Sequence, residues 1–401
     1  MRVLVSAGLS LLAIATPALA QPTPDITPED RLIHDQMLVL DTHLDIPSRF
    51  ASGWDFGQRH EYFQDHTQTD LPRMAEGGLD GGFFVIYTGQ GELTPAGYAS
   101  ARDRALLRAT EIHRMIGQNR DRIVLATTAD DAEAAWRAGK AFAFLSIENS
   151  WPLGEDLTLL ETFSKLGVTM AGPVHSRDNQ LADSTTGQNT NGGLSPLGRQ
   201  WVAEMNRLGL LIDVSHSSDA AFDQMLQLSR VPIIASHSGP KALRDHPRNL
   251  DDDRMRALAR AGGVMFLNSL FLAPHDTSPE RSAIERRQAN WANLNAAERR
   301  EVVAELARVE ARRPFNDATF ETYMQALLHS IRVMGADHVG LGADWDGGGG
   351  VQGYEDITRL PRVTARLRRE GISEADIAKI MGGNLLRVLR LAQAGAERRS
   401  E

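Results

Sequence analysis

The stretch LVLDTHLD, residues 38–45, runs from apolar residues directly into a histidine and a carboxylate, His43 and Asp45. Later apolar runs end in the same way, and the residues that follow or close them are Glu148, His175, His216, His237 and Asp344. A fold that gathers the ends of its strands in one place would bring all of these side chains together. Histidines and carboxylates in this number are typical of a two-metal hydrolase site, so the pattern predicts function as well as fold.

Eight segments of this kind are expected to be β-strands, and most are continuously apolar rather than alternating. Burial on both faces explains such a composition, and parallel sheets have both faces covered. The segments between them are long enough for crossover helices, so the sequence predicts an α/β fold, a (β/α)8 TIM-like barrel. The expected strands are 37–45, 82–88, 141–148, 167–175, 208–216, 231–237, 263–268 and 338–344.

A doubly wound open sheet is the alternative architecture for strands that alternate with helices. It would place its ligand groups at one switch point, with a glycine-rich turn after the first strand. Here the first strand ends in His43-Leu44-Asp45, and polar residues follow many different strands. A barrel assembles its active site from the C-terminal ends of many strands, so this distribution favours the barrel.

The composition narrows the classes of partner and chemistry. With 401 residues, of which 42% are hydrophobic and 24% charged, the chain suits a single barrel domain with a large core. A net charge of −9 argues against nucleic acid or an anionic membrane surface as the main partner. The chain has no cysteine, so any zinc must be held by histidine, aspartate and glutamate.

The first twenty residues have the pattern of a signal peptide. Arg2 supplies a positive charge, residues 3–14 are mostly apolar, and Ala18-Leu19-Ala20 forms a cleavage site. An N-terminal core helix is the alternative for the apolar run. Residues 393–401 are polar and charged and contain no hydrophobic anchor signal. We therefore expect residues 1–20 to be removed and the protein to be exported, periplasmic or secreted, without a membrane anchor.

The remaining chain divides into a linker, one hydrolase domain and a polar tail. We assign residues 21–30 to the linker, 31–395 to the domain and 396–401 to the tail. Within the domain, residues 278–313 are rich in arginine, glutamate and alanine and exceed what a minimal barrel needs. We expect a helical excursion there. It could serve as a lid, a dimer contact or a solvated element, and we favour the last.

Three histidines have local features of metal ligands. His43 and Asp45 are two residues apart on one strand, so their side chains face the same side. An incidental histidine beside a capping aspartate is the alternative. His216 and His237 each follow a buried run in a Ser-His-Ser context. Matching ends on consecutive strands would set the two imidazoles side by side, which favours metal binding over separate structural roles.

Two carboxylates complete the predicted site. Glu148 ends a buried strand without a neighbouring cation in the sequence, so it must pair with a distant arginine or bind metal. If it reaches both histidine groups, it can bridge two cations. Asp344 can orient the attacking water, take its proton and pass it to a leaving amine. A turn aspartate is the alternative for Asp344, and Asp346 is a second candidate for the same role.

Six motifs follow one another in the chain: DTHLD (41–45), SIEN (146–149), DVSH (213–216), ASHS (235–238), HPRN (246–249) and GLGADWDG (340–347). In these motifs the chain resembles the membrane (renal) dipeptidase family, zinc peptidases of the metal-dependent amidohydrolase superfamily, from about residue 34 to about residue 391. The resemblance implies two Zn²⁺ per chain. His43 and Asp45 would hold one and His216 and His237 the other, with Glu148 bridging them.

The resemblance also implies roles for two residues that the strand pattern leaves undecided. His175 would contact the substrate and stabilise the oxyanion of the tetrahedral intermediate, and Arg248 would bind the free C-terminal carboxylate. From sequence alone they would be interpreted as a core histidine and a surface arginine. The implied activity is hydrolysis of dipeptides by a metal-bridging hydroxide. A related barrel amidohydrolase acting on a lactam, lactone or N-acyl amino acid is the alternative enzyme, and a barrel kept as a binding protein is the non-enzymatic alternative.

The sequence departs from the family pattern at three points. Trp345 stands where a phenylalanine is common, which is expected to narrow the pocket. Because there is no cysteine, a homodimer would have to form without a disulfide. Because there is no C-terminal hydrophobic tail, no lipid anchor is expected. The expected partners are therefore small dipeptide substrates, with no nucleic acid and no membrane anchor.

Overall fold

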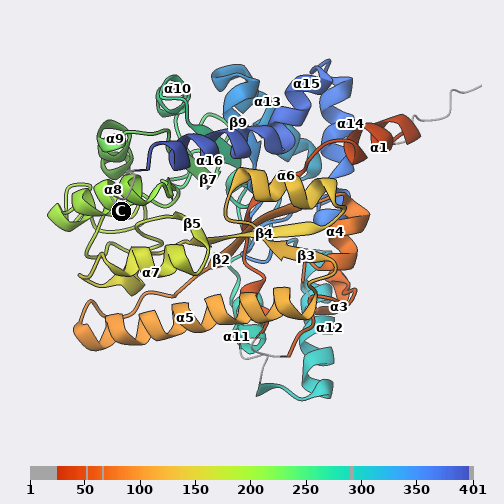
Figure 1. Ribbon diagram of the computed structural model, residues 1–401. Coiled ribbons are helices and arrows are strands. Elements are labelled where there is room, and N and C mark those ends of the chain that lie inside the picture. Colours follow the sequence, from red (N-terminus) through yellow and green to blue (C-terminus); the bar gives the residue numbers. More distant parts are fainter. Residues whose placement is uncertain (1–24, 51–52, 66, 290–292, 397–401) are drawn as a thin grey trace, which may run out of the picture.

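The computed structural model describes residues 25–50, 53–65, 67–289 and 293–396 and shows parallel β-strands surrounded by helices (Figure 1). One sheet has the order β1-β2-β4-β5-β6 with β3 paired to β4, and a second has the order β7-β8-β9. The strands are β1 (Leu40–Leu44), β2 (Gly81–Ile86), β3 (Ile123–Leu125), β4 (Ala141–Ile147), β5 (Val168–Ala171), β6 (Leu211–Ile212), β7 (Ile234–Ser238), β8 (Val264–Leu267) and β9 (Val339–Leu341).

Isolated parallel bridges connect the two sheets at both of their outer strands. Asp213, just after β6, pairs with Ile234 in β7, and Leu44 in β1 pairs with Trp345, beyond β9. This curled arrangement of parallel strands confirms the predicted α/β class. β3 was not predicted, because three residues form too short an apolar run to be recognised. It pairs with the first residues of β4, whose last residues pair with β5.

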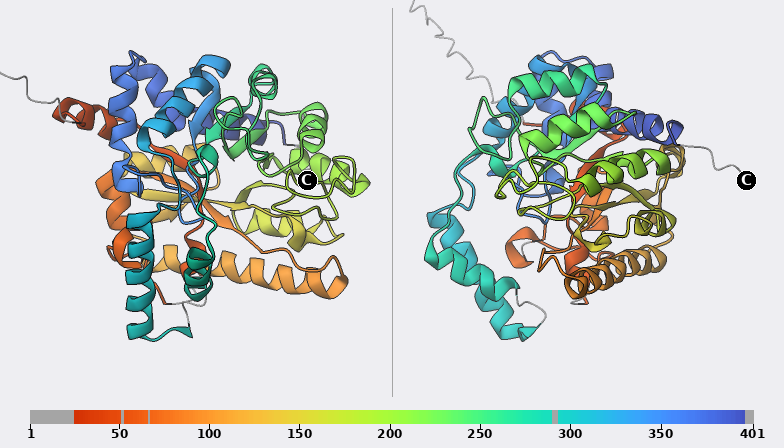
Figure 2. Two further views of the ribbon diagram at one scale, coloured as in Figure 1. Left: turned by 180° about the vertical axis from the view of Figure 1, so that it is seen from behind. Right: turned by 90° about the vertical axis from the view of Figure 1, so that its left-hand side faces the viewer.

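Helices lie between the strands and around the sheets (Figures 1 and 2). The longer ones are α1 (Pro28–Asp35), α4 (Leu71–Gly77), α5 (Pro95–Gln118), α6 (Ala129–Arg137), α7 (Leu159–Lys165), α8 (Pro196–Leu208), α9 (Asp219–Leu228), α10 (Asp252–Arg260), α13 (Phe320–Met334), α14 (Pro361–Arg369) and α16 (Asn384–Ala394). The structure also contains short turns of helix: α2 (Pro47–Phe50), α3 (Tyr62–Asp65), α15 (Glu374–Ala378), η1 (Trp151–Leu153), η2 (Leu270–Leu272), η4 (Ala336–His338), η5 (Ile357–Arg359) and η6 (Lys379–Gly383).

Short polar side chains determine where the main helices begin. Thr94, Ser195, Ser218 and Thr319 each accept a hydrogen bond from the backbone N–H three residues further on, at the start of α5, α8, α9 and α13. Such N-caps satisfy backbone donors that have no partner inside the helix. The caps therefore set the point at which each connection from a strand end turns into its helix.

Aromatic residues of β2 and β4 fill much of the core. Phe83, Phe84, Phe142 and Phe144 are fully buried, and each such side chain contributes about 1.5–3 kcal/mol to folding through removal of apolar surface from water. These strands pair in an unbroken parallel register from Gly81↔Phe142 onward. The well-packed centre holds the strand ends, and hence the polar residues that follow them, in fixed relative positions.

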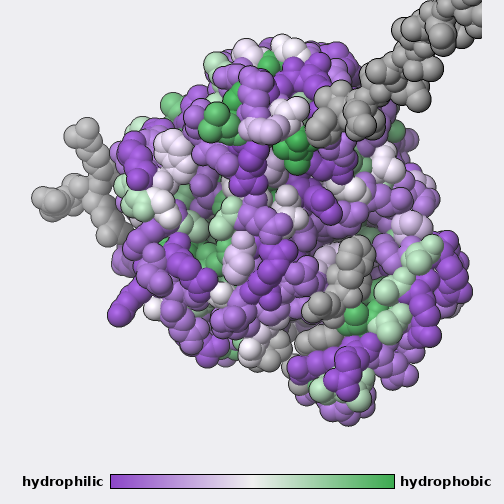
Figure 3. Space-filling view, turned by 90° about the vertical axis from the view of Figure 1, so that its right-hand side faces the viewer, coloured by the Kyte–Doolittle hydropathy of each residue, from purple (hydrophilic) through white to green (hydrophobic). Residues whose placement is uncertain are grey.

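Residues 278–313 contain two helices, α11 (Pro279–Ala289) and α12 (Ala296–Arg312). They pack together through a small apolar cluster of Ile284, Val302, Leu306 and Val309. Figure 2 shows this helix pair projecting from the body of the molecule, and the surrounding face in Figure 3 is largely hydrophilic with small apolar groups. Arg281 joins the pair to the chain before it through an ion pair with Asp276 at 3.0 Å.

Both predicted terminal segments fall largely outside the described part of the chain. Residues 1–20, the predicted signal peptide, are not described, and neither are residues 397–401 of the predicted tail. Helix α1 begins at Pro28, so the last residues of the segment assigned to the linker are helical. Among the described helices, none combines the length and the apolar character needed to cross a membrane.

Candidate metal centre

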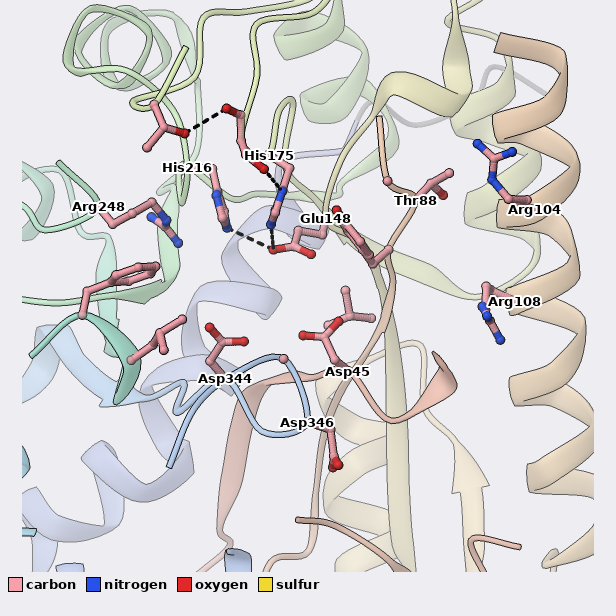
Figure 4. A pocket seen from close by; sticks show the side chains of 18 of the residues that line it. Asp45, Thr88, Arg104, Arg108, Glu148, His175, His216, Arg248, Asp344 and Asp346 are labelled. Carbon is pink, nitrogen blue, oxygen red and sulfur yellow. Dashed lines mark hydrogen bonds and ion pairs between the residues drawn. The ribbon is translucent and has the colours of Figure 1, made fainter. Parts of the chain in front are cut away.

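The eight predicted site residues lie together at the C-terminal ends of the parallel strands. A cavity of about 870 Å³ opens there, lined by Asp45, Glu148, His175, His216, Arg248 and Asp344 (Figure 4). The other two residues, His43 and His237, are buried, and both reach Glu148. The residues that end the apolar runs therefore lie together at one cavity, as the sequence predicts.

Most strands end earlier than predicted, so several site residues lie in loops. His43 and His237 are within β1 and β7, and Glu148 directly follows β4. However, β5 ends at Ala171 and β6 at Ile212, before His175 and His216. At His216 the backbone has φ of 69°, a left-handed conformation that cannot continue a strand ladder. The predicted strand bounds 167–175 and 208–216 are therefore wrong at their C-terminal ends.

One oxygen of Glu148 is the meeting point of the imidazoles. Its Oε1 lies 3.0 Å from Nε2 of His216, 3.5 Å from Nε2 of His237 and 3.6 Å from Nε2 of His43. The Nε2 atom of His175 is also 3.6 Å away. A carboxylate placed between imidazoles from β1, β7 and two loops could contact a cation held by any of them.

Two further carboxylates lie close to His43. Its Nε2 atom lies 3.2 Å from Oδ2 of Asp45 and 4.0 Å from Oδ1 of Asp344. His43, Asp45 and Asp344 form one of three sets whose donor atoms are close enough to share an ion. The other two sets are His43, Glu148 and His237, and Glu148, His175 and His216. The three sets overlap and form one continuous volume of nitrogen and oxygen donors.

Burial sets the charge state of these groups before any cation is considered. It lowers the pKa of His216 and His237 well below the usual value, so both imidazoles are neutral, as ligands must be. Burial also raises the pKa of Glu148 to about 8. Burial opposes protonation of His43, but the charges of Asp45 and Glu148 outweigh it and raise that pKa to about 10. Without a cation, protonated His43 therefore supplies the positive charge beside these carboxylates.

The donors fit a divalent metal. The Nδ1 atom of buried His43 has no hydrogen-bond partner among the described residues, and its Nε2 atom faces three carboxylates. The Nε2 atoms of His216 and His237 face each other at 2.9 Å, a separation at which two lone pairs repel unless a proton or a cation lies between them. Imidazole and carboxylate donors suit zinc, manganese and cobalt. The residues could therefore hold a metal, whereas without one several buried polar atoms lack partners.

A hydrogen-bonded chain behind His237 sets the tautomer of this ring. The Ser236 hydroxyl donates to Oδ2 of Asp213 at 2.6 Å, because an ionised carboxylate can only accept. A lone pair of the Ser236 hydroxyl oxygen then faces Nδ1 of His237 at 2.8 Å, so Nδ1–H of His237 donates to Ser236. The Nε2 lone pair is thereby directed at Glu148 and the donor cluster. Such outer contacts orient metal-binding histidines in general.

His175 lies at the edge of the cluster and is one-quarter exposed. Its ring packs against His216 and Tyr87, with ring centroids 4.1 and 4.8 Å apart. Its Nδ1 atom is 2.6 Å from the Ser176 hydroxyl, and its Nε2 faces the cavity. Burial, together with the charge of Arg248, lowers the pKa of His175 to about 4. The structure therefore places a neutral imidazole beside Glu148.

Arg248 is a buried cation without an ion-pair partner in the described part of the chain. Its Nη2 donates to the carbonyl of His237 at 3.2 Å, its guanidinium lies 5.3 Å from the Phe271 ring centroid, and its Nε has no partner. Burial lowers its pKa to about 10, so the group remains charged at neutral pH. Sequence reasoning alone suggests a surface residue here, yet only 5% of Arg248 is exposed. It faces the cavity beside the donor cluster (Figure 4).

The structure separates the two candidate bases. Asp344 points toward the histidines, and Oδ2 accepts a hydrogen bond from Nδ2 of Asn268 at 3.3 Å. Burial raises the pKa of Asp344. Asp346 points away from Glu148 in Figure 4 and accepts a hydrogen bond from the backbone of Gln68 at 3.0 Å. The orientation favours Asp344 over Asp346 as the candidate general base.

Sequence reasoning missed several residues that hold the site. Asn268 closes the predicted strand 263–268, just as the site histidines close theirs, but an amide is not a common metal ligand. Gly347 is required because a Cβ atom there would lie 2.2 Å from carboxylate oxygens of both Asp344 and Asp45. Gln68 is distant in sequence from both candidate bases. Its Oε1 accepts a hydrogen bond from the backbone N–H of Asp346 at 2.7 Å, and its Nε2 donates to the carbonyl of Gly349.

The backbone conformation also identifies this region. Four non-glycine residues of the described chain have positive φ, and three of them are His216, Asp344 and Asp346. A left-handed conformation costs a non-glycine residue about 1–2 kcal/mol, and such residues cluster at functional sites. These backbone conformations direct the side chains of His216 and Asp344 into the same cavity.

The donors around Glu148 and the charged groups beside them define a metal-dependent hydrolase. Comparison with known proteins narrows that class, because the family described as membrane dipeptidase (peptidase family M19) matches residues 28–401. The chain belongs to this family and is a metallodipeptidase.

Individual relatives agree with the family match. Dipeptidase tcpJ of Claviceps purpurea is 32% identical over 80% of this chain and 68% of its own length. The crystal structure of the probable dipeptidase PvdM from Pseudomonas aeruginosa has 29% identity and a TM-score of 0.78, covering 92% of this chain and 98% of its own. A metallopeptidase from Rhodobacter sphaeroides, liganded with a phosphinate mimic of L-Ala-D-Ala, has 27% identity and a TM-score of 0.70, covering 89% and 99%.

Proposed function

We propose that the protein is a zinc-dependent dipeptidase that hydrolyses the peptide bond of dipeptides with a free C-terminal carboxylate. In this proposal each chain holds two Zn²⁺. His43 and Asp45 would hold one, His216 and His237 would hold the other, and Glu148 would bridge them. Three observations support this assignment: His43 and Asp45 share a donor set, the Nε2 atoms of His216 and His237 face each other at 2.9 Å, and Glu148 belongs to two donor sets.

The observation that carries the substrate assignment is the unpaired guanidinium of Arg248. A buried charge is costly unless it is compensated, and no carboxylate of the described residues pairs with this one. It shares a cavity with Glu148 and Asp344. A carboxylate brought by the substrate would compensate the charge through a two-pronged hydrogen bond. The C-terminal carboxylate of a dipeptide lies one residue from the scissile bond, which suits this short separation.

The remaining side chains have distinct tasks in this reaction. When bound, the metal ions would polarise the scissile carbonyl and acidify a water molecule. Asp344 accepts a proton from the attacking water and passes it to the leaving amine, while Asn268 orients its carboxylate. In this proposal the Ser176 hydroxyl, 2.6 Å from Nδ1 of His175, donates to it, so that the ring proton is on Nε2 and stabilises the developing oxyanion.

The proposal extends to the molecule as a whole. We propose that the two sheets form one eight-stranded TIM-like barrel, with the bridges at Asp213 and Leu44 as its two seams. We also propose that the mature protein lacks residues 1–20 and acts in the periplasm or outside the cell, on small dipeptides. A homodimer, if it forms, would lack a disulfide because the chain has no cysteine.

The test is a metal-restoration assay on the purified mature protein. After chelation, Zn²⁺ is returned, metal content is measured, and hydrolysis of L-Ala-L-Ala, L-Ala-D-Ala, their C-terminal amides and a β-lactam is compared. We expect two zinc ions per chain and hydrolysis of free dipeptides only. One metal per chain would contradict the binuclear site. Equal rates on amides would contradict the carboxylate role, and turnover of the β-lactam alone would favour the alternative amidohydrolase.

A further inference from the structure

The wall of the cavity opposite Arg248 is formed by one face of helix α5. Arg104, Leu107 and Arg108 line the same cavity of about 870 Å³ as the donor side chains around Glu148. In Figure 4, Arg104 and Arg108 lie on one side, Arg248 and His216 lie on the other, and Glu148 lies between. The cavity thus has a cationic group at each end. Neither arginine of α5 has a role in the metal centre or in the reaction derived above.

The helical period explains why both arginines face the cavity. Residues three and four apart lie on one face of a helix, so Arg104, Leu107 and Arg108 form a continuous surface. The neighbouring position on this face, Glu111, is 7% exposed and anchors the surface to the body. The Arg108 Nη1 atom donates to Oε2 of Glu111 at 2.6 Å, which holds this guanidinium and offsets part of its charge.

Arg104 carries the less compensated charge. Its Nη1 atom donates to the hydroxyl of Ser100 at 2.6 Å, and its guanidinium lies 5.7 Å from the ring centroid of Trp151. No ion pair joins Arg104 to a carboxylate of the described residues. Trp151 lies three residues beyond Glu148, in the segment that leaves β4. The same segment therefore supports Arg104 and positions the central metal-binding carboxylate.

Thr88 supplies a polar group between the two parts of the cavity. It follows β2, lines the cavity, and lies between Glu148 and Arg104 in Figure 4. Its hydroxyl oxygen is buried and has no hydrogen-bond partner among the described residues. A buried hydroxyl without a partner is unfavourable, so a ligand that offers it a hydrogen bond is stabilised there.

We infer that Arg104 and Arg108 bind a carboxylate in the side chain of the N-terminal residue of the substrate, so that L-aspartyl and L-glutamyl dipeptides are preferred. This inference rests on the proposed function. With the C-terminal carboxylate on Arg248 and the scissile bond at Glu148 and Asp344, the N-terminal residue extends toward α5. The exposed side chain of Leu107 offers apolar contact for the methylene groups, and the arginines offer donors that match a carboxylate.

The experiment compares the isosteric substrates L-Glu-L-Ala and L-Gln-L-Ala with the zinc-loaded enzyme. The measured quantity is the ratio of their kcat/KM values. We expect about a fivefold preference for L-Glu-L-Ala, the upper range for a partly exposed ion pair. The ratio should fall toward one in Arg104→Ala and further in the Arg104→Ala/Arg108→Ala double variant. Arg104→Glu should invert the charge preference, so that L-Lys-L-Ala becomes the better substrate.

Arg102→Ala is the matched control, because Arg102 is on the same helix and does not line the cavity. It should keep the parent ratio. A parent ratio of one, or a ratio that survives the double variant or changes equally in Arg102→Ala, would overturn the inference. These outcomes differ from failure of the proposed function, in which neither dipeptide, nor L-Ala-L-Ala, is hydrolysed after zinc is restored.

Discussion

The two ends of the cavity are built in different ways, and the difference separates chemistry from selectivity. At one end, Arg248 and the proposed metal ligands other than Asp45 are buried, and hydrogen bonds with the backbone and with neighbouring side chains fix Arg248 and His237. At the other end, Arg104 and Leu107 are exposed on the face of a single helix. Changes at the strand ends should therefore alter the reaction itself, whereas changes on α5 should alter which substrates react or how stable the helix is.

The largest expected effect is at Asp344, at the reaction end. Asp344→Asn keeps the size of the side chain but removes the proton acceptor, so kcat should fall about 10²- to 10⁴-fold. Metal content, measured after dialysis, should stay close to that of the parent because the five proposed ligands remain. Asp346→Asn is the control, since Asp346 points away from the cluster, and it should lose far less activity. A near-normal rate for Asp344→Asn would show that another group moves the proton.

Arg248 provides the next test, because it defines the buried end of the cavity. Arg248→Ala should lower kcat/KM for free dipeptides roughly 10- to 100-fold, through loss of charge-assisted hydrogen bonds. Arg248→Lys should recover only part of this, because a lysine keeps the charge without the planar fork. The measurement is the ratio of rates on a dipeptide and on its C-terminal amide. If the two variants retain the parent ratio, the substrate carboxylate binds elsewhere.

These two tests concern residues that the sequence revealed to different degrees. Asp344 and the five proposed ligands could be predicted because each follows an apolar run, and parallel strands must bring their C-terminal ends to one edge. Arg248 could not be predicted in this way, because it lies in a loop ten residues beyond β7. Only the family resemblance gave it a role. Periodicity indicates which residues share an edge, but not how a long loop returns to it.

The supports of the site were less predictable still. The need for glycine at residue 347 depends on how close the Asp45 and Asp344 side chains come, which no local pattern shows. The contact of Gln68 with Asp346 joins residues 278 positions apart. The early end of β6 at Ile212 and the left-handed backbone at His216 are of the same kind, since a tertiary arrangement prevailed there over an apolar pattern. Sequence patterns therefore predicted which residues gather at the cavity better than the contacts that position them.

Ser236 allows one of these supports to be tested behind the metal centre. Ser236→Ala removes the acceptor for Nδ1–H of His237 and should weaken metal binding about 10- to 100-fold, as loss of such outer contacts does in general. Competition with a chelator measures the affinity. Ser238→Ala is the matched control: Ser238 adjoins His237 on the other side, and no hydrogen bond of the described residues links its hydroxyl to that ring. Equal affinities in the two variants would mean that the ring is oriented by packing alone.

The smallest effect is expected at the helical end, and it should appear in stability rather than in catalysis. Thr94 caps α5 by accepting a hydrogen bond from the N–H of Gly97 at 3.1 Å. Thr94→Ala should lower the free energy of unfolding by about 1 kcal/mol, as measured by denaturant titration. Thr110→Ala is the control within the same helix: the Thr110 hydroxyl bonds only to the carbonyl of Leu106 one turn back, and alanine favours a helix interior. That variant should be as stable as the parent or more so. If Thr94→Ala instead reduced turnover of L-Ala-L-Ala as strongly as Asp344→Asn, α5 would belong to the reacting part of the cavity, and the division between its two ends would fail.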